Sequence, residues 1–127
     1  MQLVTIEQKY TDYLRQFDNR VSKNIDITYV RPYLGILFKV QEKEYFAPLT
    51  SSGKGKKLKD NPKIESTTFF PIDNCNLGGI NLNNMIPVIP GVYKPFDIDN
   101  EPTQRKIFLQ KQVMFLRKKE DYIIKNI

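Results

Sequence analysis

The chain changes from apolar to basic within one stretch, Tyr45-Phe46-Ala47-Pro48-Leu49-Thr50-Ser51-Ser52-Gly53-Lys54-Gly55-Lys56-Lys57. The stretch begins as an apolar strand, passes through hydroxyl side chains and continues into glycines and lysines. A strand that ends at Thr50 and Ser51 would fix two hydroxyl groups beside flexible cations. Such a place suits a phosphate, because hydroxyl and backbone N–H groups orient phosphate oxygens while lysines supply charge. A solvated basic turn after a strand is the alternative interpretation.

Length and composition predict one globular domain over residues 1–127. Hydrophobic residues make up 40% of the chain and aromatic residues 12%, which indicates a packed core rather than disorder. The formal net charge of +6 makes a polyanion a reasonable partner. The sequence shows no signal-peptide pattern and no apolar run of transmembrane length. We therefore expect a cytoplasmic protein with no membrane partner.

The chain has no histidine and a single cysteine, Cys75. Without histidine it has no Ser-His-Asp or Cys-His nucleophile, no histidine acid–base pair and no histidine metal ligand. One cysteine cannot form an intrachain disulfide or a zinc site. Magnesium held by carboxylates stays open in principle, but the acidic residues are scattered along the chain. We predict no metal site and no cofactor.

Hydrophobic spacing predicts a helix near each end of the chain. Over residues 6–17, apolar side chains recur with a helical period and place Tyr10 on a buried stripe with Tyr13 and Phe17. Core packing is the alternative to a site role for Tyr10. A second helix is predicted over residues 102–126. Its apolar face is formed by Leu109, Val113, Leu116 and Ile123.

Between these helices the pattern predicts short strands. Residues 33–40 are almost continuously apolar and suit a central strand, and residues 45–49 return as its hairpin partner. Residues 51–63 are expected to form a long loop. Further strands are predicted at 65–73, 80–83, 85–89 and 92–98. The predicted fold is α+β, with a compact antiparallel, barrel-like sheet flanked by N- and C-terminal helices.

Two segments hold most of the excess positive charge. The predicted loop contains five lysines against one acidic residue, and residues 101–127 contain seven basic residues against three acidic ones. If both segments lie on one face of the protein, we expect that face to form a groove that binds nucleic acid. Aromatic rings, among them Tyr29, are available for stacking on bases. We assign RNA binding to Tyr29, Lys56, Lys57, Lys59, Lys111, Arg117 and Lys118.

Four segments, in the same order along the chain, together resemble the ToxN/AbiQ toxins of type III toxin–antitoxin systems. The first runs from Leu3 to Leu14 and includes Lys9-Tyr10. The second is Tyr45-Phe46-Ala47-Pro48-Leu49-Thr50-Ser51. The third and fourth are Leu77-Gly78-Gly79-Ile80-Asn81-Leu82-Asn83-Asn84-Met85-Ile86-Pro87-Val88 and Leu109-Gln110-Lys111-Gln112-Val113-Met114-Phe115-Leu116-Arg117.

The resemblance implies a sequence-selective endoribonuclease with a barrel-like sheet similar to the MazF and Kid toxins. Because the sequence lacks clusters of metal ligands, we expect this endoribonuclease to be metal-independent. It implies cellular or phage RNA as substrate, growth inhibition or phage-induced cell suicide, and no DNA partner. It also implies a structured antitoxin RNA, a repeat pseudoknot, that the toxin processes and that inhibits it within a closed protein–RNA hetero-oligomer.

The resemblance also implies site residues. Tyr10, Thr50 and Ser51 match family active-site positions, and Lys54 is the counterpart of the family lysine after the Thr-Ser pair, with altered spacing. A family lysine expected after the segment Tyr29-x-x-Pro32 is missing, and Arg31 is the candidate that replaces it in RNA binding.

With no histidine and no evident metal cluster in the sequence, RNA cleavage is expected to use the substrate's own 2′-OH. Attack on the adjacent phosphate leaves a 2′,3′-cyclic phosphate and a 5′-OH, and the enzyme aligns the attack and neutralises the growing charge. Ser51 and Thr50 would orient the phosphate, Lys54 or Arg31 would stabilise charge, and Tyr10 would position a phosphate or sugar. A non-catalytic RNA-binding domain is the alternative. A nucleotide enzyme fits less well, because the chain lacks the Gly-x-x-x-x-Gly-Lys-Ser/Thr pattern.

Overall fold

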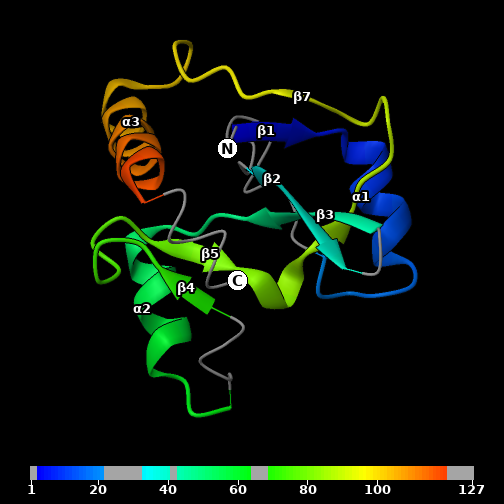
Figure 1. Cartoon of the computed structure of the whole chain (residues 1–127), viewed down its shortest axis with the longest axis horizontal. Coiled ribbons are helices and arrows are strands. Elements are labelled where there is room, and N and C mark those ends of the chain that lie inside the picture. The colour runs from blue at the N-terminus through cyan, green and yellow to red at the C-terminus, as the bar shows by residue number, and fades with distance from the viewer. Residues whose placement is uncertain (1–2, 22–32, 41–42, 64–68, 120–127) are drawn as a thin grey trace.

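A computed structural model describes residues 3–21, 33–40, 43–63 and 69–119. This part of the chain combines small antiparallel sheets with helices that lie to their sides (Figure 1). The α+β prediction is therefore confirmed at this level. The larger sheet has five strands in the order β6-β3-β2-β1-β7. Their bounds are Leu3–Ile6 for β1, Tyr33–Val40 for β2, Lys43–Pro48 for β3, Ile86–Pro87 for β6 and Tyr93–Pro95 for β7.

The predicted hairpin is formed by β2 and β3. These strands pair antiparallel, with Tyr33 opposite Pro48 and Phe38 opposite Tyr45. The register shifts between Leu34 and Phe38, which marks a bulge or similar irregularity. The long apolar run in the sequence thus predicted both the strand and its central position correctly.

A second, two-stranded sheet consists of β4 (Phe69–Pro71) and β5 (Gly79–Asn81). It is joined to the first sheet just beyond the end of β3, where Leu49 forms an antiparallel bridge with Ile80. The expected barrel-like closure is not found among the described strands, which form two open sheets. Very short strands that carry proline lie at the edges of the larger sheet, β6 and β7, where a residue without a backbone N–H cannot extend the pairing.

The prediction of a loop over residues 51–63 is wrong, because residues Ser52–Asp60 form helix α2. Glycine normally weakens a helix by about 1 kcal/mol relative to alanine, and α2 contains two glycines. Packing explains this exception at Gly55. A Cβ atom added there would lie 3.0 Å from Thr50 Oγ1 and 3.2 Å from the Gly78 backbone, so glycine lets α2 approach this backbone closely.

The end helices are α1 (Gln8–Arg15) and α3 (Thr103–Lys118), and a short 3-10 helix, η2, spans Leu82–Asn84. On α3, Leu109 and Leu116 are buried as predicted and Val113 is half-buried. On α1 the predicted stripe is partly wrong, because Tyr13 and Phe17 are 55% and 74% exposed. Helix α1 buries Tyr10, as predicted, together with Thr11, and the two exposed rings pack edge to face.

Two hydrophobic clusters hold these elements together. The first joins β1, the end of β3, β5 and α3 through Leu3, Leu49, Ile80 and Leu116. The second joins β1, α1, β2, β3 and β6, and its buried members are Val4, Ile6, Tyr10, Tyr33, Phe46 and Ile86. Within the described ranges, no helix is both long and apolar enough to cross a membrane.

The turn between β4 and β5 has an unusual backbone. Asp73, Asn74 and Cys75 have φ angles of 49°, 51° and 70°, and Gly78 has a φ of 72°. Residues other than glycine rarely adopt φ angles in this left-handed region. A Cβ atom at Gly78 would lie 1.9 Å from the carbonyl oxygen of Thr50. Only glycine therefore fits this turn in contact with the strand end.

We predict that Gly78→Ala lowers the free energy of unfolding by about 2–4 kcal/mol, since it combines backbone strain with overpacking against Thr50. Chemical denaturation checks this value. Gly91→Ala is the matched control, because Gly91 also has a positive φ, of 88°, but no heavy atom lies within 4 Å of its added Cβ. Equal losses in the two variants would contradict the close contact at Gly78.

Candidate phosphate site at the N-terminus of α2

Ser51 occupies the N-cap position of α2. Its backbone is extended, with φ −68° and ψ 167°, and its side chain accepts a hydrogen bond from the backbone N–H of Lys54 at 3.3 Å. The residue is exposed to solvent. A hydroxyl that accepts through a lone pair still has its own proton to donate. Ser51 can therefore cap the helix and donate to a phosphate oxygen at the same time.

The first turn of α2 adds further donors beside Ser51. The helix itself provides no acceptors for the N–H groups of Ser52 and Gly53, because the first N–H groups of any helix lack intrahelical partners. The helix dipole places partial positive charge at the same end. No acidic residue in the first turn offsets this charge. A phosphate is the kind of ligand that such a helix end binds.

Thr50 lies behind Ser51 rather than beside it at the surface. The residue is 3% exposed, and its hydroxyl is buried without a hydrogen-bond partner in the described structure. Its backbone N–H donates to the carbonyl oxygen of Gly79 at 2.9 Å. Its carbonyl oxygen accepts from the side-chain amide of Gln112 at 3.3 Å. The backbone that leads into Ser51 is thus held from two sides.

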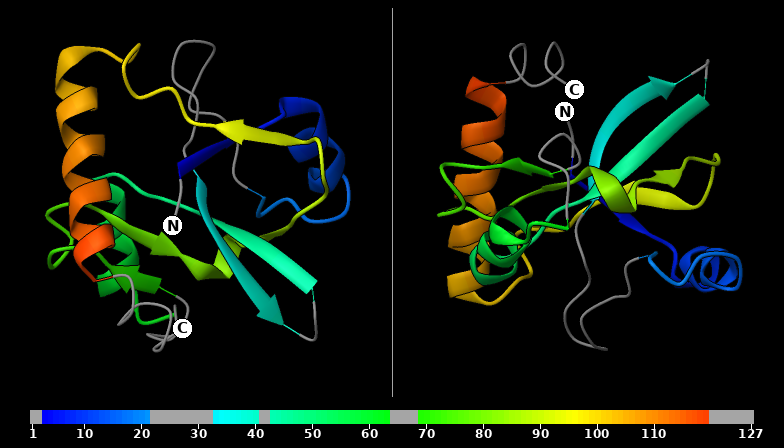
Figure 2. Two further views of the ribbon diagram at one scale, coloured as in Figure 1. Left: turned by 45° about the horizontal axis from the view of Figure 1, so that its top comes forward. Right: turned by 90° about the horizontal axis from the view of Figure 1, so that it is seen from below.

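Tyr10 lies in another part of the molecule. Its hydroxyl donates to the carbonyl oxygen of Pro87 at 2.7 Å, and its ring belongs to the second hydrophobic cluster. Burial, and to a smaller extent Tyr13, raises the pKa of its hydroxyl, so Tyr10 is a donor at neutral pH and not a base. Figures 1 and 2 show α1 and α2 on opposite sides of the molecule. The structure does not bring Tyr10 and Ser51 together.

The predicted basic residues lie on two helices at one side of the molecule. Lys54, Lys56 and Lys57 are exposed on α2. Lys59 is exposed as well, and its ammonium group donates to the Asn74 side chain at 2.5 Å. Helices α2 and α3 appear on the same side in all three ribbon views (Figures 1 and 2). On α3 the exposed basic residues assigned to RNA are Lys111, Arg117 and Lys118. Tyr29 and Arg31 lie outside the described residues.

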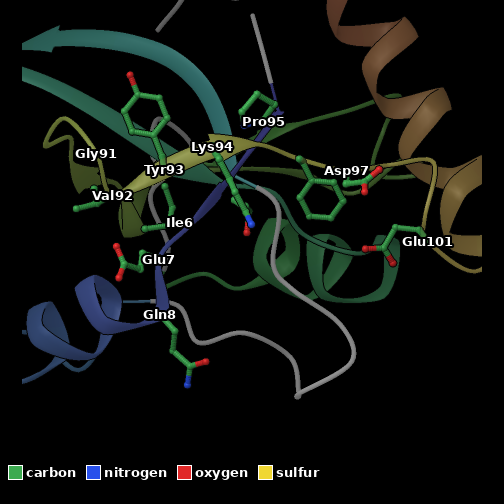
Figure 3. Close-up of a pocket in the computed structure, with 12 residues that line it drawn as sticks. Ile6, Glu7, Gln8, Gly91, Val92, Tyr93, Lys94, Pro95, Asp97 and Glu101 are labelled. Carbon is green, nitrogen blue, oxygen red and sulfur yellow. The ribbon is translucent and has the colours of Figure 1, made fainter.

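A hollow of about 590 Å³ lies elsewhere, between β1, β7 and the approach to α3 (Figure 3). Its charged lining consists of Glu7, Asp97, Glu101 and Lys94, so carboxylates outnumber the single cation. Such a lining repels phosphate. We therefore place the candidate phosphate site at the end of α2 and not in this hollow.

The residue types near this end of α2 do not form a metal site. In the described parts of the chain, no group of three or more histidine, cysteine, aspartate or glutamate side chains is placed to hold an ion. The donor set at the site consists of hydroxyl, N–H and ammonium groups, which suit an anion.

Sequence reasoning missed Gln112, which is 1% exposed and contacts the backbone beside Ser51. A signal was present, because Gln112 lies three residues after Leu109 and four before Leu116 on the apolar face of α3. A polar residue on such a face needs partners inside the protein. Gly78 could also have been singled out, because the glycine pair Gly78-Gly79 indicates a tight turn or a close backbone approach.

The chain is similar to known endoribonucleases over most of its length. The chain is 38% identical over 97% of its length to an endoribonuclease ToxN of Pectobacterium atrosepticum, and it spans 75% of that protein. It is 30% identical over 92% of its length to endoribonuclease AbiQ of Lactococcus lactis subsp. lactis, and it spans 66% of that protein.

Solved structures are also similar to this chain in fold and sequence. One, from a bacterial antiviral system regulated by a processed non-coding RNA, covers 99% of the chain with a TM-score of 0.77 at 36% identity, over 81% of that structure. Another, of a type III system whose toxin is inhibited by a non-coding RNA pseudoknot, covers 98% with a TM-score of 0.75 at 32% identity, over 74% of that structure. Residues 2–127 match the model of the family described as toxin ToxN, type III toxin–antitoxin system. The chain therefore belongs to the ToxN family of type III toxin–antitoxin endoribonucleases.

Proposed function

We propose that this ToxN-family chain cleaves RNA by helping the substrate's 2′-OH to attack the adjacent phosphate, which leaves 2′,3′-cyclic phosphate and 5′-OH ends. The observation that carries the proposal is the exposed hydroxyl of Ser51 at the N-terminus of α2, beside Lys54. The chain has no histidine, and the described residues contain no cluster of metal-ligating side chains, so a reaction in which the substrate supplies the nucleophile suits it best. The protein then contributes alignment and charge stabilisation.

Each donor at the helix end has a distinct role in this proposal. Ser51 donates its hydroxyl proton to a non-bridging phosphate oxygen while its oxygen caps the helix. The N–H groups of Ser52 and Gly53 face the negative charge that grows on the phosphate, and Lys54 adds a full positive charge. Losing one such donor costs on the order of 10²–10³-fold in rate.

Thr50 and Tyr10 have supporting roles in the proposal. Thr50 is buried, so its contribution is to hold the backbone that carries Ser51 rather than to contact phosphate from the surface. Tyr10 anchors β6 through Pro87, and this buried contact favours support of the fold over contact with the reacting phosphate. Their direct participation in the reaction stays a prediction.

The partner we propose is a structured antitoxin RNA that inhibits the toxin, because a solved relative is inhibited by an RNA pseudoknot. The exposed cations of α2 and α3 supply the phosphate contacts for such an RNA and for cellular or phage substrates. The proposal extends to processing of repeat RNA, to a closed protein–RNA hetero-oligomer and to action in the cytoplasm. A barrel-like sheet similar to that of MazF and Kid belongs to the same set of proposals.

We predict that RNA cleavage is independent of divalent metal ions. The donor set at the site lacks metal ligands, so excess EDTA should leave the rate within about twofold, since it removes none of the donors. Gel assays with analysis of the product ends check both points. Loss of cleavage in EDTA, or products with 5′-phosphates, would overturn the proposed chemistry.

We predict that Ser51→Asp folds but does not cleave. Aspartate is a good N-cap and interacts favourably with the helix dipole, so stability should stay within about 1 kcal/mol of the wild type, whereas its negative charge repels phosphate. Ser51→Ala should lose about 1 kcal/mol of stability along with its cleavage activity. Circular dichroism, thermal melts and a cleavage assay separate these effects.

The matched control is Ser52→Ala, one residue further along the chain and outside the cap position. It should keep most of the cleavage activity. Expression without antitoxin extends the test to cells, where the Ser51 variants should be tolerated. A folded Ser51→Asp variant that still cleaves RNA would contradict the assignment.

We predict that RNA affinity falls steeply with salt and that the lysines of α2 set part of this slope. The double change Lys56→Ala/Lys57→Ala should flatten the log–log slope by roughly 1–2 units, about one for each phosphate contact removed. Filter binding at several salt concentrations measures this slope. Lys94→Ala is the control, because Lys94 lies among the carboxylates of the separate hollow. Equal slopes in both variants would refute an RNA surface on α2.

A further inference from the structure

We propose that Gln112 is a positioning residue for RNA cleavage, because its side-chain amide fixes the peptide unit between Thr50 and Ser51. The inference rests on the proposed function, in which Ser51 and the first turn of α2 hold the reacting phosphate. It assigns a role in catalysis to a buried side chain on α3, a helix whose other polar residues are exposed or half-buried.

The amide of Gln112 bridges two separate segments. Its nitrogen donates to the Leu77 carbonyl oxygen at 2.8 Å and to the Thr50 carbonyl oxygen at 3.3 Å. Both acceptors are carbonyls, so the NH₂ end of the amide must be the end that faces them. Glutamine is one of the few side chains that can supply two such donors without a charge. The bridge ties the turn before β5 to the strand end that leads into α2.

The Thr50 carbonyl oxygen belongs to the same planar peptide unit as the Ser51 N–H. Rotation of this unit would change the direction of the Ser51 backbone and of the first turn of α2. The Gly78 backbone lies so close that a Cβ atom added to it would be 1.9 Å from the Thr50 carbonyl oxygen. This close approach limits the rotation on one side. The Gln112 amide holds the same oxygen through a hydrogen bond. Together, the close approach of Gly78 and the hydrogen bond from Gln112 restrict this rotation.

Stability alone does not account for this glutamine. Gln112 is 1% exposed, and its side-chain oxygen is buried with no hydrogen-bond partner in the described structure. An unpaired buried acceptor is unfavourable, and apolar residues of similar size are often tolerated in its place. Leu109 and Leu116 fill the neighbouring positions of the same face. A glutamine at this position gives directional bonds that leucine or methionine cannot give.

Two substitutions test the role of the donors. Gln112→Met keeps the approximate shape and removes both hydrogen bonds. Gln112→Glu presents one donor when its carboxyl group is protonated and only acceptors, facing two carbonyls, when it is ionised. Burial raises the pKa of such a carboxyl group, so the protonated form should persist to higher pH than for an exposed glutamate. Gln110→Met is the matched control, because Gln110 is exposed on the same helix.

Single-turnover cleavage of an RNA oligonucleotide is measured beside the affinity for its analogue with 2′-deoxy sugars, which cannot be cleaved by 2′-OH attack. For Gln112→Met we expect a loss on the order of 10²-fold in the cleavage rate constant. Affinity should change less than about threefold, because exposed cations supply most of it. Circular dichroism confirms that the variant is folded. Gln110→Met should match the wild type in every measurement.

The pH profile gives a readout that a purely structural role does not move. The rate of Gln112→Glu relative to wild type should rise as the pH falls and the carboxyl group becomes a donor. If Gln112→Met does not fold, the Gln112→Glu profile carries the test. A wild-type rate in folded Gln112→Met, a flat ratio for Gln112→Glu, or failure of both variants to fold would overturn the proposal. If wild-type protein cleaves and Ser51→Asp also cleaves, the proposed function fails instead, whatever the Gln112 variants do.

Discussion

The site depends on a close backbone contact between the end of β3 and the turn before β5. Thr50 donates its N–H to Gly79 at 2.9 Å, and Leu49 bridges to Ile80. The turn is closed in itself, since Ile72 donates to the Gly78 carbonyl oxygen at 2.9 Å. No side chain fits between the backbones of Thr50 and Gly79, because they are joined directly by this hydrogen bond. The contact therefore joins the two sheets and also fixes where α2 begins.

Helix α2 forms at this place although its own sequence opposes a helix. Gly53 and Gly55 weaken it, and Lys54 places a positive charge at the end where the helix dipole is already positive. Packing of Gly55 against Gly78 and capping by Ser51 offset these losses. A positive helix end costs stability in the free protein and favours the binding of phosphate. Under the proposed function, the two glycines and the positive end that weaken α2 as a helix serve phosphate binding.

The sequence predicted the parts of the fold that follow from hydrophobic period. The apolar run at residues 33–40 and the apolar face of α3 needed no knowledge of tertiary contacts. Helix α2 could not be predicted in this way, because it is stabilised by a glycine that packs against a distant glycine, Gly78. The exposure of Tyr13 and Phe17 was missed for a related reason, since a short helix packs only part of its apolar side. For the candidate site, local chemistry identified Ser51 and the lysines, whereas the burial of Thr50 and the distant place of Tyr10 depend on long-range packing.

The proposed function divides two tasks between neighbouring parts of one surface. Exposed cations on α2 and α3 can attract any phosphate backbone, and flexible lysines demand little of its shape. The N-terminus of α2 is held by backbone contacts and by Gln112, so under the proposed function its donors would hold a phosphate in a fixed orientation. In-line attack by a 2′-OH needs that orientation. A folded RNA can therefore occupy the cations tightly while its own geometry keeps a 2′-OH out of line. On this argument, inhibition by a structured RNA and cleavage of a flexible one use the same lysines and differ at Ser51.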